Sequence, residues 1–152
     1  MAEIKTSILS ILGEQIKPGE SKEVNFDIAN LHTSSSVNVP IIIERSKKPG
    51  PTVLFTSGIH GDEVNGVEIV RHLIEKGINK PRIGTIICMP VINIFGFINL
   101  KREFPDGRDL NRVFPGSPSG SLAGRVAHKL MEGIIPHVDI IIDFHTGGSG
   151  RF

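Results

Sequence analysis

Short, continuous apolar runs alternate with segments of helical periodicity over the second part of the chain. Three of these runs are TVLFTS at residues 52–57, IGTIICM at 83–89 and VDIIIDF at 138–144. Strands that are buried on both faces have this composition, whereas a strand with one face in water alternates apolar and polar residues. We therefore expect an α/β fold in which helices cover a largely parallel sheet.

Two of the segments between these runs are predicted helices. Each carries apolar residues at the spacing of one helical stripe, and the first ends before Gly77 while the second ends at Pro136. The stripes consist of Val64, Val67, Val70 and Ile74 in the first helix, and of Leu122, Val126, Leu130 and Ile134 in the second. A long polar loop, residues 93–118, precedes the second helix.

The beginning of the chain has a different pattern. KEVNFDIAN alternates apolar and polar residues, and VNVPIII at 37–43 follows a polar loop, so two strands are predicted there. Pro40 favours an edge position for the second strand, because proline cannot donate to a ladder. RSKKPGP then interrupts the pattern. We place an N-terminal β segment at residues 1–48 and an α/β unit at residues 49–152.

Composition excludes several classes of function. The 152 residues suffice for one domain with a real core, and 17 basic against 16 acidic residues give a net charge of +1. With this charge the chain has no overall electrostatic field that would attract nucleic acid or a membrane surface. Because it has no Trp or Tyr, it also has few side chains on which nucleic-acid bases could stack. ILSIL near the start is too short for a signal peptide, and Cys88 suits a buried thiol, so we expect a cytoplasmic protein.

Histidines follow two of the predicted strands. His60 comes after TVLFTS and His145 after VDIIIDF, and the carboxyl ends of strands in open α/β sheets are where ligands collect. Glu63 begins the first helix and can reach the same point. Two histidines and one carboxylate are the ligand set of a catalytic zinc. Because His-x-x-Glu is also common by chance, and Glu63 suits the first turn of a helix electrostatically, spacing alone leaves both interpretations open.

The long loop contains LKREFPDGRDLNRVFPG, which brings together planar side-chain donors. Arg beside Asn, as in Asn111 and Arg112, suits a carboxylate, and a further Arg could stabilise an oxyanion. A solvated charged loop is the alternative, but DLNRVFPG places these polar residues between apolar ones. Asp143 lies two residues before His145 on the same strand face and could orient it, or could be an ordinary strand-end acid.

GIHGDE, REFPDGRDLNRVFPG and DFHTGG, in this order and spacing, resemble the succinylglutamate desuccinylase and aspartoacylase family, relatives of the zinc carboxypeptidases. The resemblance covers roughly residues 20–152 and corresponds to the N-terminal half of a usual member. It implies a zinc-carboxypeptidase-like fold, truncated here, with a mixed, mostly parallel sheet and flanking helices. It also implies one Zn²⁺ per chain, bound by His60, Glu63 and His145.

The resemblance further implies roles for the loop. Arg102 would polarise the scissile carbonyl, Asn111 and Arg112 would hold the substrate carboxylate, and Asp109 would brace them. The activity implied is that of a zinc-dependent amide hydrolase that removes an acyl group from an N-acyl amino acid or a similar small carboxylate. The expected partner is therefore a small-molecule carboxylate, with no nucleic acid and no membrane.

Two expectations concern what this chain does not contain. In the family, the general base is a glutamate located after the DFHTGG histidine, and no acid of this sequence is an obvious substitute. The alternative function is therefore a metal-binding, catalytically inactive fragment or pseudoenzyme. The sequence also stops soon after the third apolar strand, which would leave a hydrophobic sheet edge unpaired, so we expect a homo-oligomer, a dimer or larger.

Overall fold

A mixed sheet of five strands, in the order β3-β4-β6-β5-β7, forms the centre of the molecule. The computed structural model describes residues 8–30 and 32–148. The strands of the sheet are β3 (Ser21–Asn30), β4 (Ser36–Arg45), β5 (Thr52–Ser57), β6 (Thr85–Met89) and β7 (Ile140–Phe144). β5 is parallel to both β6 and β7, whereas β4 is antiparallel to β3 and β6. The α/β class and the three apolar strands are confirmed.

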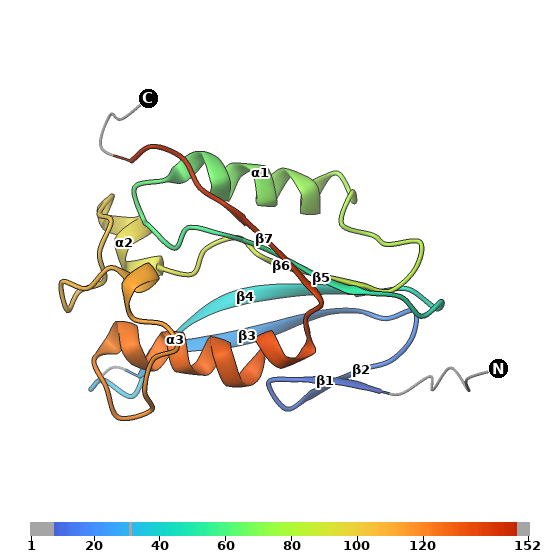
Figure 1. The fold of residues 1–152 in the computed structure, drawn as a ribbon, viewed down its shortest axis with the longest axis horizontal. Coiled ribbons are helices and arrows are strands. Elements are labelled where there is room, and N and C mark those ends of the chain that lie inside the picture. Colours follow the sequence, from blue (N-terminus) through green and yellow to red (C-terminus); the bar gives the residue numbers. More distant parts are fainter. Residues whose placement is uncertain (1–7, 31, 149–152) are drawn as a thin grey trace.

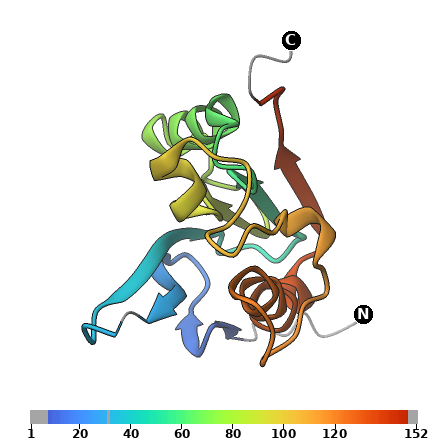
Figure 2. The same ribbon diagram turned by 90° about the vertical axis from the view of Figure 1, so that its left-hand side faces the viewer.

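Helices lie on both sides of this sheet, with α1 and α3 on opposite sides (Figures 1 and 2). The helical elements are α1 (Val64–Glu75), α2 (Ile94–Asn99), α3 (Leu122–Gly133) and the short 3₁₀ helices η1 (Leu110–Arg112) and η2 (Ile135–His137). The two predicted helices are thus confirmed as α1 and α3. Ser121 caps α3, since its hydroxyl accepts the Gly124 N–H at 3.2 Å.

Much of the apolar core lies between α3 and the sheet. Val126 and Leu130 of the predicted stripe are buried there against Phe26 and Ile41 in one apolar cluster. An additional hairpin, which the sequence analysis did not predict, contributes to this cluster through Ile11 and Ile16. Its strands are β1 (Leu9–Ile11) and β2 (Glu14–Ile16). None of the helices among the described residues is long and apolar enough to cross a membrane.

The edge position predicted for the strand around Pro40 is wrong. β4 lies between β3 and β6, and β3 is the edge strand on that side. β6 pairs only with the Ile42–Arg45 part of β4, so the backbone of Pro40 faces one partner strand and its missing N–H breaks no ladder with β6. β3 and β4 belong to the same sheet as β5, and a division of the chain after residue 48 remains a proposal.

Two further expectations need correction. The connection of residues 93–118 is not a plain loop, because it contains α2 and η1. VDIIIDF is not buried, because β7 is the other edge of the sheet and pairs only with β5 within the described part of the chain. Ile140, Ile141 and Ile142 are consequently 49%, 51% and 41% exposed. Alternate residues of a strand point to opposite faces, so β7 is open to solvent on both faces.

Candidate metal centre

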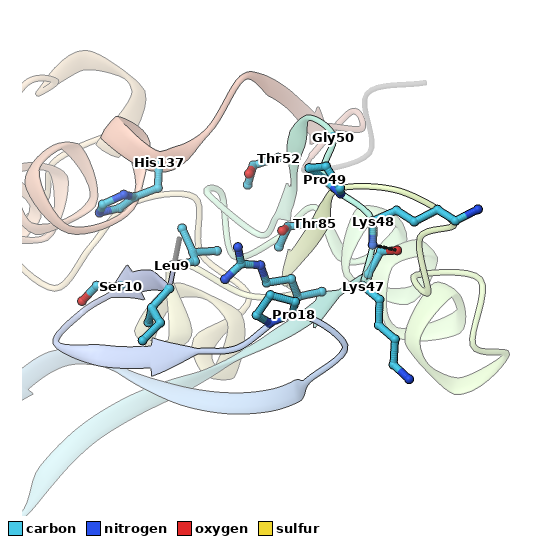
Figure 3. A pocket seen from close by; sticks show the side chains of 14 residues that line it. Leu9, Ser10, Pro18, Lys47, Lys48, Pro49, Gly50, Thr52, Thr85 and His137 are labelled. Carbon is cyan, nitrogen blue, oxygen red and sulfur yellow. Dashed lines mark hydrogen bonds between the residues drawn. The ribbon is translucent and has the colours of Figure 1, made fainter. Parts of the chain in front are cut away.

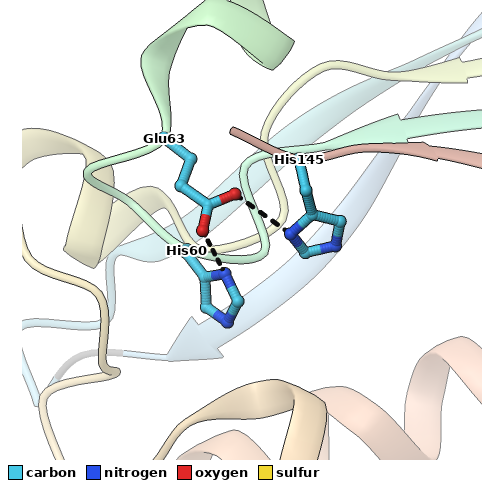
Figure 4. Close-up of side chains that lie close together, drawn as sticks. All are labelled: His60, Glu63 and His145. Carbon is cyan, nitrogen blue, oxygen red and sulfur yellow. Dashed lines mark hydrogen bonds and ion pairs between the residues drawn. The ribbon is translucent and has the colours of Figure 1, made fainter. Parts of the chain in front are cut away.

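Glu63 lies between His60 and His145, with one carboxylate oxygen directed at each imidazole (Figure 4). Its Oε1 is 2.7 Å from Nδ1 of His60, and its Oε2 is 3.0 Å from Nδ1 of His145. One ligand atom from each of the three residues lies within 4.8 Å of the others. Nitrogen and carboxylate donors at this spacing are of the kind that Zn²⁺ takes in proteins, so the donor set fits one such ion.

Parallel pairing of β5 and β7 places the two histidines at one edge of the sheet. The register joins Ser57 to Phe144, the last residues of the two strands, so the residues that follow emerge side by side. β5 and β7 are therefore direct neighbours in the sheet. His60 and Glu63 are buried, whereas 37% of the His145 side chain is exposed.

Two glycines permit the close packing around this centre. A side-chain carbon on Gly61 would overlap the backbone of Gly96 and Phe97 in α2. A Cβ on Gly66, in the first turns of α1, would lie 2.5 Å from the carbonyl oxygen of Phe144. Only glycine therefore allows α1 to sit directly on the end of β7, which keeps Glu63 beside His145.

We expect Gly66→Ala to push α1 away from β7. Because overpacking of a tight contact costs about 1–3 kcal/mol, the free energy of unfolding should fall by that amount in denaturant titrations. Zinc affinity should fall as well, since the shift separates Glu63 from His145. Gly120→Ala is the control, because its nearest neighbour would be an ordinary 3.4 Å away. A Gly66→Ala protein as stable as the unchanged chain would contradict this packing argument.

Carboxylates also hold the outer nitrogens of both histidines. Nε2 of His60 is 3.0 Å from Oδ1 of Asp109, and Nε2 of His145 is 2.6 Å from Oδ2 of Asp143. A carboxylate at the far nitrogen fixes the ring orientation and the tautomer of a metal-binding histidine. Both Nδ1 atoms are thereby left directed at the common point beside Glu63. Asp109 and Asp143 thus lie against the outer nitrogens of His60 and His145.

Asp109 connects the segment of residues 93–118 to the cluster of His60, Glu63 and His145. Its Oδ2 accepts hydrogen bonds from Arg102 Nε at 3.1 Å and Nη2 at 2.9 Å, and Nη1 of Arg102 lies 3.5 Å from Glu63. Nε of Arg112 is 3.6 Å from the same oxygen, and 84% of the Arg112 side chain is exposed. Nδ2 of Asn111 is 3.5 Å from Nε2 of His60. All the predicted loop residues thus surround the cluster.

Hydrogen bonds keep the two central carboxylates ionised. Burial raises the pKa of Glu63, but the Thr146 N–H and His60 outweigh it and hold that pKa below its usual value. Burial likewise raises the pKa of Asp109, and the opposing bonds from Arg102 and His60 lower it further than burial raises it. Both groups are therefore anionic at neutral pH, as binding to a cation requires.

An open cleft of about 430 Å³ borders the cluster. Its walls come from Asp62, Glu63, Arg102, Arg112, Thr146, Gly147 and Gly148. The volume suits a small molecule, and the two guanidinium groups suit an anionic one. Asp62 and the Thr146 backbone were not expected from the sequence, where only their proximity to His60 and His145 could have indicated them.

A second hollow lies at the opposite end of the sheet, at the amino ends of β5 and β6 (Figure 3). Lys47 and Lys48 belong to its lining, but their side chains extend away from it. Ligands of such sheets bind beyond the carboxyl ends of the strands, which is where the histidine cluster lies. Cys88 is no competing centre either, because it is fully buried and burial raises its pKa to about 12.

Fold and site together define an α/β protein in which a His-x-x-Glu motif and a second histidine at the strand ends could hold a metal ion. Residues 49–152 match the model of the succinylglutamate desuccinylase/aspartoacylase catalytic domain. The chain is also 33% identical over 114 residues to the N-alpha-acetyl-L-2,4-diaminobutyric acid deacetylase of Halomonas elongata, covering 74% of this chain and 33% of that protein. The chain belongs to the succinylglutamate desuccinylase/aspartoacylase family.

Solved structures show the same fold. An aspartoacylase family protein from Mesorhizobium loti superposes with a TM-score of 0.75 at 32% identity, covering 85% of this chain and 41% of that one. A succinylglutamate desuccinylase/aspartoacylase from Rhodobacter sphaeroides gives 0.72 at 34% identity, with 85% and 40% covered. The zinc-carboxypeptidase-like fold is thereby confirmed, and the chain spans less than half the length of these relatives.

Proposed function

We propose that this chain is the metal- and substrate-binding part of a zinc-dependent deacylase that acts on an N-acyl amino acid or a similar small carboxylate. The observation that carries the proposal is the His60, Glu63 and His145 cluster beside a cleft lined by two arginines. The relatives of this chain support the class of reaction, since the Halomonas protein is a deacetylase of an N-acetylated diamino acid. A product-bound ectoine utilization protein EutE (DoeB) from Ruegeria pomeroyi, 28% identical with a TM-score of 0.72, shares the fold.

The side chains at and around the cleft have two proposed roles, which are to bind the substrate carboxylate and to polarise the scissile carbonyl. Arg102 is held by Asp109 at the rim of the cluster, with Nη1 toward Glu63, so its guanidinium can stabilise negative charge that develops on a carbonyl oxygen nearby. Asn111 and the exposed Arg112 are the proposed ligands of the substrate carboxylate. A zinc ion would be held by His60, Glu63 and His145, and it would supply the Lewis acidity that the reaction needs.

Arg112→Lys tests the carboxylate site. Charge-assisted hydrogen bonds contribute about 1.5–3 kcal/mol, so losing the planar fork should weaken binding of an N-acetyl amino acid to the zinc-loaded chain by roughly 10- to 100-fold in calorimetry. Arg125→Lys is the matched control, since Arg125 lies on α3 and donates to the Gly120 carbonyl. If the zinc-loaded chain bound an α-carboxamide analogue as tightly as the carboxylate, this assignment would be wrong.

Turnover separates the two candidate functions. Without the family's general base, the 152-residue chain should hydrolyse N-acyl amino acids about 10²- to 10⁴-fold more slowly than an enzyme that has one. Slow release of amino acid that stops when zinc is chelated favours the deacylase. Binding of metal and substrate with no release favours the alternative, a binding protein that lacks the base. Turnover at several per second, as in ordinary enzymes, would contradict the expected impairment.

A further inference from the structure

We propose that Thr56 is a positioning residue for His145, which it reaches through Asp143. The inference rests on the proposed function and adds a residue to the same metal centre. Thr56 lies on β5 and is only 4% exposed. Its hydroxyl donates a hydrogen bond of 2.9 Å to Oδ1 of Asp143 on the neighbouring strand β7. Thr56 and Asp143 are direct partners in the register of the two strands.

Asp143 is held at both of its oxygens. While Oδ1 accepts from Thr56, Oδ2 lies 2.6 Å from Nε2 of His145, and Nδ1 of that ring faces Glu63 at 3.0 Å. A carboxylate fixed at one oxygen cannot rotate without breaking that bond, so its second oxygen has a defined position. The hydroxyl of Thr56 therefore sets the orientation of the imidazole that is two hydrogen bonds away.

His145 needs such an anchor more than His60 does. His60 is buried and lies between Glu63 and Asp109, which is itself held by Arg102. The His145 side chain is 37% exposed and follows an edge strand, so it is packed less closely than the His60 side chain, which is 3% exposed. Outer partners of metal-binding histidines fix the orientation of the ring. Their effect is largest on a ring that the surrounding side chains do not already hold in place.

The test is a zinc titration of purified chain against a competing chelator. Thr56→Val removes the hydroxyl and keeps the shape, and we expect zinc affinity to fall about 10-fold, within the 10- to 100-fold range of outer partners. Thr56→Ser keeps the hydroxyl and should bind like the unchanged chain. Thr52→Val is the matched control, because Thr52 is a buried threonine at the other end of β5. Should Thr56→Val fail to fold, Thr56→Ala serves as the second variant without a hydroxyl.

A double-mutant cycle distinguishes positioning from a general loss of stability. If Thr56 acts through Asp143, Thr56→Val should have little further effect on zinc affinity in an Asp143→Asn background. An equal loss in both backgrounds, or a loss no larger than that of Thr52→Val, would overturn the positioning role. Failure of the unchanged chain to bind zinc would overturn the proposed function as well, whereas normal binding with an unaffected Thr56→Val variant overturns the positioning role alone.

Discussion

Replacing His60 or His145 by alanine should lower the zinc affinity of the purified chain by more than about 100-fold, since even the outer partners of metal ligands cost 10- to 100-fold. Each substitution removes one of the three donor atoms that lie within 4.8 Å of one another, and no other described histidine reaches the cluster. Glu63→Gln should act in the same direction, because it removes the negative charge between the two rings while keeping the shape.

Metal content is measured after reconstitution, because chelators and low pH remove zinc from such ligands during purification. His72→Ala is the matched control, since His72 is a half-exposed histidine on α1 that pairs with Glu68. Unchanged metal content in both His60→Ala and His145→Ala would show that the cluster is not the metal site, whatever the family relationship.

The second large effect should concern the edge of the sheet at β7. We expect the chain to form dimers or larger assemblies in sedimentation experiments, because β7 carries three consecutive isoleucines that are 41–51% exposed. Among residues 8–30 and 32–148, β7 also pairs on one side only, with β5. An exposed apolar edge strand is a template for pairing with another chain. Symmetric pairing of two copies along β7 would satisfy the backbone groups and bring the isoleucines of the two copies side by side.

Ile141→Lys should shift this chain to a monomer, because a charged side chain at the edge opposes pairing. Ile83→Lys is the control, since Ile83 is 53% exposed but lies outside β7, before β6. A strictly monomeric unchanged chain at micromolar concentrations would refute the association, and an assembly that persists in Ile141→Lys would assign it to another surface.

Patterns that act over a few residues could be interpreted from the sequence. The apolar runs of β5 and β6, the helices α1 and α3 and the burial of Cys88 depend on local periodicity, and all of them are present in the structure. The stripe predicted for the first helix is only partly correct, because Val67 and Val70 are buried but Val64 is 42% exposed. The two wrong predictions concern which strands lie next to each other in the sheet. Pro40 favoured an edge strand and VDIIIDF a buried one, but the position of a strand in a sheet depends on which strands pair with it, and periodicity does not contain that information.

The candidate site divides in the same way. GIHGDE and DFHTGG were enough to place His60, Glu63 and His145 after predicted strands, because possible metal ligands and the end of a strand can both be recognised within a few residues. The motifs do not reveal that both Nδ1 atoms face Glu63, or that a separate carboxylate holds the outer nitrogen of each ring, because each of these arrangements includes a contact between distant parts of the chain. Thr56 and Asp143 are 87 residues apart, and a hydrogen bond of 2.9 Å between them exists only because the register of β5 and β7 aligns them. Hydrogen bonds weaken steeply with distance and angle, so the roles of these side chains follow from long-range strand pairing that no local motif contains.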